Sequence, residues 1–236
     1  MQRLYTGTSG FAYKEWKGSF YPEDLPESKM LSYYAEHFGA VEINNTFYRM
    51  PSETVLTNWA AQVPAHFQFV LKASRQITHL KRLKDVGEPL NYLLNTSAVL
   101  GAQRGPFLVQ LPPNLKIDLE RLKIFLGILP ADVRAAFEFR HESWFDEGTF
   151  AALREHNAAL CIAHVEEEDG AVQTPFEATA DWGYLRLRQV QYAEGELEDW
   201  AERVKQPEWG DVFVFFKHED EGTGPKLAKR FEQVLA

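Results

Sequence analysis

The chain alternates short apolar stretches with longer segments in which apolar residues recur at helical spacing. Runs of about four to eight apolar residues bounded by Gly, Pro or charge are typical of buried strands. We expect eight strands, at residues 4–10, 40–45, 67–74, 107–112, 134–140, 159–165, 183–188 and 212–218. Helical patterns separate most of them, at residues 27–38, 53–63, 88–103, 119–129, 146–157, 197–204 and 225–235.

Strand alternating with helix favours parallel βαβ units, and eight units indicate a (β/α)8 TIM barrel of about 250 residues. The chain has 236 residues, so we expect one α/β barrel domain over residues 1–236. After the sixth strand, EEEDGAVQTPFEATAD predicts an irregular connection, with the helix reduced or missing. An open doubly wound sheet is the alternative, but GTSGFAYKEW lacks the third glycine of the dinucleotide-binding motif.

Polar residues interrupt the second expected strand, in the stretch AVEINNTFYRMP. Glu42 and Asn44 are two residues apart, so they share one face of a strand. In a barrel, functional groups lie at the C-terminal ends of the strands, where the mouth opens. The same reasoning places further polar side chains at the mouth: Lys72, Gln110, Glu138, Arg140, His164, Tyr184, Arg186, Arg188, and either Lys217 or His218.

The expected mouth is basic although the whole chain is acidic. The formal net charge is −9, so the overall field does not steer the protein to nucleic acid. Because unpaired buried charge is costly, we expect some Glu–Arg pairs, and a bound phosphate or carboxylate to balance the remaining cations. Five basic residues oppose Glu42 and Glu138 for a net charge of +3: Lys72, Arg140, Arg186, Arg188 and Lys217.

The segment after the eighth expected strand reads HEDEGTGPKLAKRF. Pro225 is a favoured first residue of a helix, and a helix start presents free N–H groups to anions. In barrels, phosphate sites often use this loop. Gly222 and Gly224 are therefore candidate ligand contacts, although the acidic run Glu219–Glu221 would repel a phosphate if it pointed inward.

Five stretches that run through most of the chain together resemble one family: GTSGFAYKEWKGSFYP, VEINNTFYRMPS, FVLKASRQITH, LVQLPPNL and FEFRHESWF. They are similar to the DUF72, or YecE-like, family of TIM-barrel proteins. The resemblance implies the barrel fold but no reaction, because the family name records an unknown function. It also implies a shared polar site that includes Glu42, Asn44, Lys72, Arg75, Gln110, Glu138, Arg140 and Trp144.

The C-terminal third departs from the pattern that this resemblance implies. The seventh strand of the family usually reads Tyr-x-Arg-x-His-Gly, whereas YLRLRQ places Arg188 at the position of the histidine. The eighth strand often ends in two asparagines, where Lys217 and His218 stand in this chain. If the asparagine pair binds ligand, these changes indicate a different or more anionic one.

Two classes of function fit these residues. The first is an enzyme, a hydrolase or lyase acting on a phosphorylated substrate, with Glu42 or Glu138 as general base. Lys72 or Lys217 could alternatively act as an imine-forming amine, because neighbouring cations lower the pKa of an amine. We therefore predict catalytic roles for Glu42, Glu138 and Lys72. The predicted ligand-binding residues are Asn44, Arg75, Gln110, Arg140, Trp144, Arg186, Arg188, Lys217, His218, Gly222 and Gly224.

The second class is a non-catalytic nucleic-acid or nucleotide binder. It would use the same cations, with aromatic side chains as stacking surfaces: Phe11, Tyr13, Trp16, Tyr48 and Trp144. We do not expect a catalytic metal, because the basic side chains at the mouth would repel one; any other cofactor stays open. A glycosidase is also not expected, since Glu42 and Glu138 come from nearly opposite strands.

Composition gives information on the cellular compartment of the protein rather than on its chemistry. Cys161 is the single cysteine, which excludes an internal disulfide and favours a reducing compartment. The stretch MQRLYTGTSG has no apolar run of signal-peptide length and no basic n-region, so we expect no signal peptide. No apolar run reaches the ~18 residues of a membrane span. We expect a cytoplasmic protein without a membrane partner, binding a small anionic ligand or nucleic acid, in an oligomeric state that the sequence leaves open.

Overall fold

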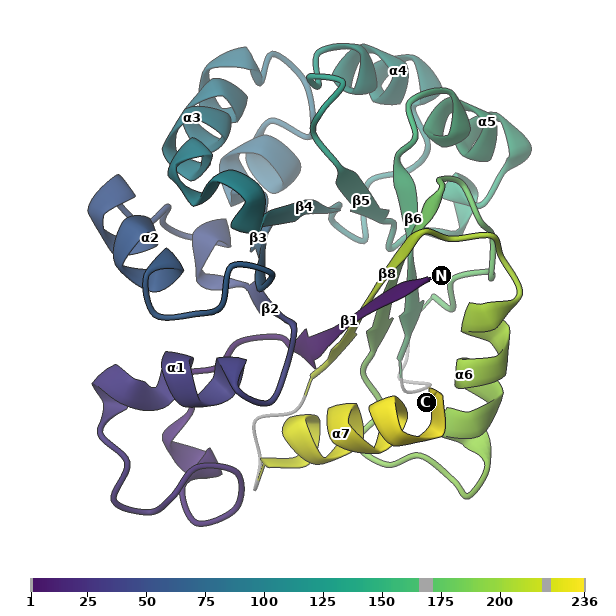
Figure 1. Cartoon of the computed structure of the whole chain (residues 1–236). Helices are drawn as coiled ribbons and strands as arrows, with labels where there is room; N and C mark the ends of the chain where they lie inside the picture. The colour runs from purple at the N-terminus through teal and green to yellow at the C-terminus, as the bar shows by residue number, and fades with distance from the viewer. Residues whose placement is uncertain (1, 166–171, 218–221, 236) are drawn as a thin grey trace.

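The computed structural model describes residues 2–165, 172–217 and 222–235. Within them, eight parallel strands form one sheet in the order β1-β8-β7-β6-β5-β4-β3-β2, and helices surround it (Figure 1). This arrangement confirms the predicted (β/α)8 barrel. The strands are β1 (Arg3–Thr8), β2 (Ala40–Ile43), β3 (Gln68–Lys72), β4 (Arg104–Gln110), β5 (Ala135–Glu138), β6 (Ala159–His164), β7 (Trp182–Leu187) and β8 (Asp211–Phe216).

A tyrosine from the first helix joins the two ends of the sheet. The Tyr34 hydroxyl accepts a hydrogen bond from the backbone N–H of Thr8 on β1, at 2.7 Å, and donates one to the Ala40 carbonyl on β2, at 3.1 Å. The side chain is fully buried. Next to this contact, a Cβ atom on Gly7 would lie 2.0 Å from the Ala40 carbonyl oxygen. The strands can meet here only because residue 7 has no side chain.

We expect Gly7→Ala to lower the free energy of unfolding by about 2 kcal/mol or more, because the added methyl must push β1 away from a backbone atom. Gly39→Ala is the matched control, since its Cβ would meet only the Tyr5 ring, at 3.7 Å. Urea denaturation of the two variants measures the difference. Equal losses of stability would show that β1 and β2 do not approach as described.

Seven α-helices lie among the described residues: α1 (Met30–Ala35), α2 (Glu53–Ala60), α3 (Gly87–Ser97), α4 (Leu119–Gly127), α5 (Glu147–Glu155), α6 (Glu196–Lys205) and α7 (Thr223–Leu235). Ser52 and Asp118 cap α2 and α4, since their side chains accept hydrogen bonds from the backbone N–H groups of Val55 and Arg121. The expected single helix over residues 88–103 is wrong. It ends at Ser97 and continues as a 3-10 segment that contains Gly101 at φ 52°.

The connection between β6 and β7 contains no helix in its described part, residues 165 and 172–181, as predicted. After β3, the chain forms a π-helix, Gln76–Leu80, before it reaches α3. None of the helices in the described part of the chain is long and apolar enough to cross a bilayer.

Alternate residues of each strand face the barrel interior. The lower interior is filled by apolar and aromatic side chains: Tyr5, Ala40, Val70, Leu108, Ala136, Ala159, Cys161, Trp182, Tyr184, Phe213 and Phe215. Burial raises the pKa of the Cys161 thiol well above its ordinary value. Because the side chains alternate, Glu42, Glu138 and Arg186 continue the inward face toward the C-terminal end, where the interior becomes polar.

Candidate functional site

Arg186 occupies the centre of the mouth and joins two carboxylates. Its guanidinium donates to Glu138 Oε2 at 2.5 Å and to Glu42 Oε1 at 2.8 Å. All three side chains are almost completely buried. Because they come from β7, β5 and β2, the planar fork of one arginine ties together strands on different sides of the barrel. We call Glu42, Glu138, Arg186 and Arg188 the central cluster.

Four donors surround Glu42. Ser9 donates to Oε1 at 2.8 Å, Asn44 to Oε1 at 3.0 Å, and Tyr184 to Oε2 at 2.6 Å, in addition to Arg186. Burial alone would raise the pKa of this carboxyl group, but the charge of Arg186 and the Tyr184 and Ser9 hydroxyls keep it below its ordinary value. β2 ends at Ile43, so Asn44 lies just beyond the strand, where its side-chain amide donates to the Glu42 carboxylate.

Glu138 is held in a similar way. Gln110 donates to Oε1 at 2.9 Å and Arg188 donates to the same oxygen at 3.2 Å, while Arg186 holds Oε2. Burial opposes ionisation, but the charges of Arg186 and Arg188 and these hydrogen bonds lower the pKa of Glu138 to about 2. The central cluster therefore has two carboxylates and two guanidinium groups, and it is electrically neutral.

Lys72 lies at the end of β3, on the inward face above the central cluster. Its ammonium lies 4.7 Å from the centre of the Phe47 ring. Among the described residues, no carboxylate oxygen comes within 4.0 Å of it. Burial and the charge of Arg186 lower the pKa of Lys72 to about 8. Lys72 is therefore a half-buried cation that forms no ion pair with a described residue, and the more distant charges of Glu42 and Glu138 offset its burial only in part.

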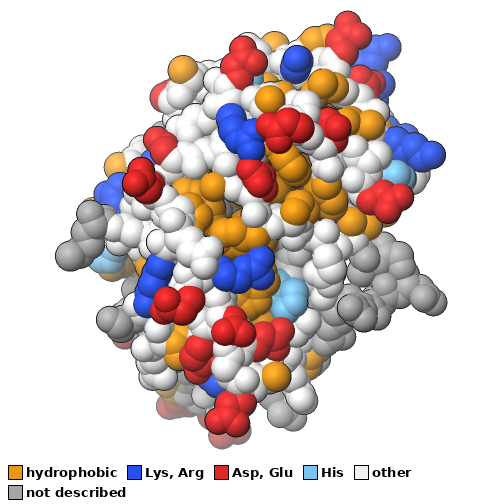
Figure 2. Space-filling view, turned by 90° about the vertical axis from the view of Figure 1, so that its right-hand side faces the viewer, with side chains coloured by type: hydrophobic (Ala, Val, Ile, Leu, Met, Phe, Trp, Pro, Cys, Tyr) orange, Lys and Arg blue, Asp and Glu red, His pale blue; other side chains and the backbone are white. Residues whose placement is uncertain are grey.

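Two exposed arginines extend this positive charge to the rim. Arg75 and Arg140 follow β3 and β5, and neither forms an ion pair with another described residue. Burial and the charges of Lys72, Arg140, Arg75 and Arg82 lower the pKa of His79, so these cations act on one place. We call Lys72, Arg75 and Arg140 the rim cations. By contrast, acidic and basic side chains are mixed on the flank shown in Figure 2.

The net charge of +3 expected at the mouth is distributed differently from the prediction. Arg186 is fully matched by carboxylates, and Arg188 contacts Glu138. Lys217 directly follows β8 and is exposed. His218 lies outside the described residues, as does the acidic run Glu219–Glu221. Among the described residues, Lys72, Arg75 and Arg140 form no ion pair, and they lie on the β3 and β5 side of the mouth.

Several residues that were predicted to contact a ligand are instead packed against other parts of the protein. Trp144 is buried, its Nε1 donates to the Leu115 carbonyl at 2.7 Å, and its ring stacks on Phe139 at 4.7 Å. Gly222 and Gly224 are buried as well. Gly222 has φ 71°, and a Cβ there would lie 2.6 Å from the Ser19 hydroxyl, so this glycine serves a close approach of two loops.

His164 was expected at the mouth but faces outward. Residues 159 and 161 of β6 point into the barrel, so the even-numbered residue points toward the helices. The His164 ring packs near Tyr192 and Trp200, with centroids 5.7 and 5.1 Å apart. Within the described residues, no three His, Cys, Asp or Glu side chains come together as a metal site requires.

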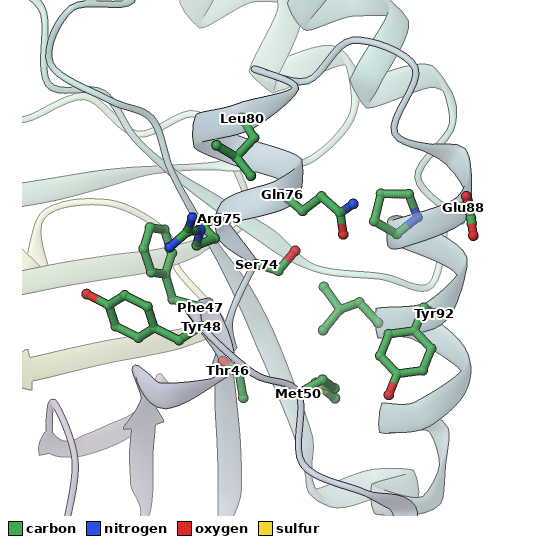
Figure 3. Close-up of a pocket in the computed structure, with 12 residues that line it drawn as sticks. Thr46, Phe47, Tyr48, Met50, Ser74, Arg75, Gln76, Leu80, Glu88 and Tyr92 are labelled. Carbon is green, nitrogen blue, oxygen red and sulfur yellow. The ribbon is translucent and has the colours of Figure 1, made fainter.

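A pocket of about 520 Å³ lies beside the rim cations (Figure 3). We call it the side pocket. Arg75 lines it, as does Phe47, whose ring contacts the Lys72 ammonium. It is enclosed by the loop after β2, the start of the π-helix and α3, through residues 46–48, 50, 74–76, 80, 88, 89, 92 and 93. Sequence reasoning missed it, because the residues from α3 have the pattern of an ordinary exposed helix surface.

Two known proteins resemble this chain, one over nearly all of it and one over half of it. UPF0759 protein YunF of Bacillus subtilis (strain 168) is 24% identical over 269 residues, covering 98% of this chain and 94% of that protein. UPF0759 protein YecE of Escherichia coli (strain K12) is 31% identical over 119 residues, covering 50% of this chain and 44% of that protein.

Two crystal structures of DUF72 family proteins share the fold. The one from Thermotoga maritima MSB8 superposes with a TM-score of 0.87 at 28% identity, covering 99% of both chains. The one from Enterococcus faecalis V583 has a TM-score of 0.77 at 21% identity, covering 100% of this chain and 97% of that one. Residues 5–236 match the family model described as protein of unknown function DUF72, and the chain belongs to that family.

Proposed function

We propose that this protein binds a small anion at the mouth, through a phosphate group that contacts Lys72, Arg75 and Arg140. The observation that carries the proposal is the ammonium of Lys72, which is half-buried and has no carboxylate within reach among the described residues. Glu42 and Glu138 compensate this charge only in part. Burial of a partly compensated charge is costly, and a bound anion lowers that cost. Guanidinium groups suit phosphate because their fork matches its oxygens.

The predicted catalytic residues divide into two kinds. Glu42 and Glu138 are ionised and accept several hydrogen bonds each, so they are poor general bases and serve to hold Arg186. Lys72 has a pKa of about 8, which suits proton transfer or attack on a carbonyl near neutral pH. Hydrolase or lyase chemistry on a phosphorylated substrate would therefore run through Lys72.

Isothermal titration with inorganic phosphate and pyrophosphate tests the site. We expect Lys72→Met to weaken binding at pH 7 by about tenfold or more, because a hydrogen bond to a charged group contributes about 1.5 to 3 kcal/mol. The affinity of the wild-type protein should also fall as the pH rises through about 8, since the ammonium is charged below its pKa and neutral above it.

Lys123→Met is the matched control, because Lys123 is an exposed lysine on α4. Circular dichroism verifies that both variants are folded. Phosphate binding that is absent from the wild-type protein, or equal in the wild-type protein and Lys72→Met, would contradict the proposal.

A further inference from the structure

We propose that the ligand is a nucleoside monophosphate, with its phosphate on the rim cations and its base in the side pocket. This inference rests on the proposed function, because the phosphate site is the same. It adds the class of ligand and a second set of contacts, which lie between the π-helix and α3. A volume of about 520 Å³ is within the range of pockets that hold small ligands.

Arg75 belongs to both the side pocket and the phosphate site, and Phe47 lines the pocket while contacting Lys72. Arg75 lines the side pocket, and its charge acts on His79 together with those of Lys72 and Arg140. Phe47 has the Lys72 ammonium 4.7 Å from its ring centre and also lines the side pocket. One ligand with an anionic end and a flat end can therefore reach both places at once.

Aromatic side chains at the side pocket are unusually exposed. Tyr48 is 74% exposed and Tyr92 is 59% exposed, and they stand on opposite sides of the pocket (Figure 3). Leu80, at 63%, and the partly buried Met50 add apolar surface. Exposed apolar groups gathered around a hollow mark ligand sites, and a base stacked on an aromatic ring contributes about 1 to 3 kcal/mol.

Polar side chains supply contacts for the edge of a base. Ser74 and Gln76 extend toward α3, on which Tyr92 lies (Figure 3). The Gln76 amide offers a donor and an acceptor in one plane, the arrangement that pairs with the N6 and N7 atoms of adenine. The side pocket therefore combines a stacking surface, an amide and, through Arg75, a link to the phosphate site.

The backbone around the side pocket is strained. The π-helix Gln76–Leu80 is followed by Arg82, Leu83 and Asp85 in the left-handed region, at φ 50°, 67° and 51°. π-Helical turns and left-handed non-glycine residues are uncommon and collect at functional sites. Here they position Arg75 and Gln76 at the junction of the mouth and the side pocket, which favours a ligand role for this segment.

Titration calorimetry with three probes separates the two sites: AMP, ribose 5-phosphate, which lacks the base, and adenosine, which lacks the phosphate. We expect the affinity for AMP to be at least about tenfold higher than that for ribose 5-phosphate. Tyr92→Ala should abolish this preference and leave the affinity for ribose 5-phosphate unchanged. Lys72→Met should weaken both phosphates. Ile124→Ala, which removes an exposed apolar side chain from α4, is the control and should change nothing.

The outcomes are distinguishable. Equal affinities for AMP and ribose 5-phosphate, or an unchanged preference in Tyr92→Ala, overturn the side-pocket inference and leave the phosphate site standing. An unchanged affinity in Lys72→Met for both phosphates overturns the proposed function itself. An oligoadenylate that binds more tightly than AMP, with an affinity that falls steeply with salt, overturns the mononucleotide in favour of a nucleic-acid strand.

Discussion

Arg186→Met is expected to lower the free energy of unfolding by about 3 to 5 kcal/mol, the usual effect of removing one partner from a buried ion pair. Arg186 contacts both Glu42 and Glu138, and all three side chains are almost fully buried. Methionine retains much of the volume but no charge. Two carboxylates would then remain in the barrel with only neutral donors and Arg188, and at least one of them should take up a proton.

Chemical denaturation at pH 7 measures this loss. Arg49→Met is the matched control, because Arg49 is exposed and the same substitution there should change stability by less than about 0.5 kcal/mol. A similar small effect at both positions would mean that the central cluster contributes little to folding. A smaller loss for Arg186→Met at pH 5 than at pH 7 would support proton uptake by the carboxylates.

Acid should destabilise the protein through Glu138. The pKa of this group is about 2 in the folded protein against 4.5 for the unperturbed side chain, so between these values the unfolded chain binds more protons. Stability therefore falls as the pH drops from about 5 to 2, and a shift of this size corresponds to on the order of 3 kcal/mol. Glu42, whose pKa is also lowered, adds to the loss in the same direction.

Unfolding curves in urea at a series of pH values test this dependence. Glu138→Gln should be less stable than the wild-type protein at pH 7 but should lose less of its remaining stability toward acid. Glu142→Gln, at an exposed position, is the control and should follow the wild-type curve. Parallel pH dependences in the wild-type protein and Glu138→Gln would contradict the low pKa.

Most of the barrel could be predicted, because alternation of apolar stretches and helical spacing is a strong signal. The errors of the prediction lie where backbone and side-chain geometry, rather than the apolar pattern, determine the structure. The long helix predicted over residues 88–103 ends at Ser97 and continues as a 3-10 segment with Gly101 at positive φ, which apolar periodicity does not reveal. The closing contact of the barrel was also hidden, because the spacing of Tyr34 indicates a core position and says nothing of its hydroxyl.

For the site, period-two reasoning brought Glu42, Glu138 and Arg186 together because inward residues share a parity along each strand. The same reasoning could not determine which charged groups pair with each other. The sum of charges left Arg186 available for a ligand, whereas the Arg186 guanidinium contacts two carboxylates at once. The side pocket escaped notice for a different reason. Tyr92 belongs to a helix that covers the barrel, and it lines a cavity only because the π-helical turn before that helix lies beside it.

The neutrality of the central cluster has a consequence for how such a barrel can diversify. The charges of its four groups cancel, so the cluster favours neither an anionic nor a cationic group beside it. Under the proposed function, the choice of ligand depends on side chains carried by connecting segments, such as the exposed Arg75 and Arg140. New specificities could be reached by changing those positions alone, at little cost to folding.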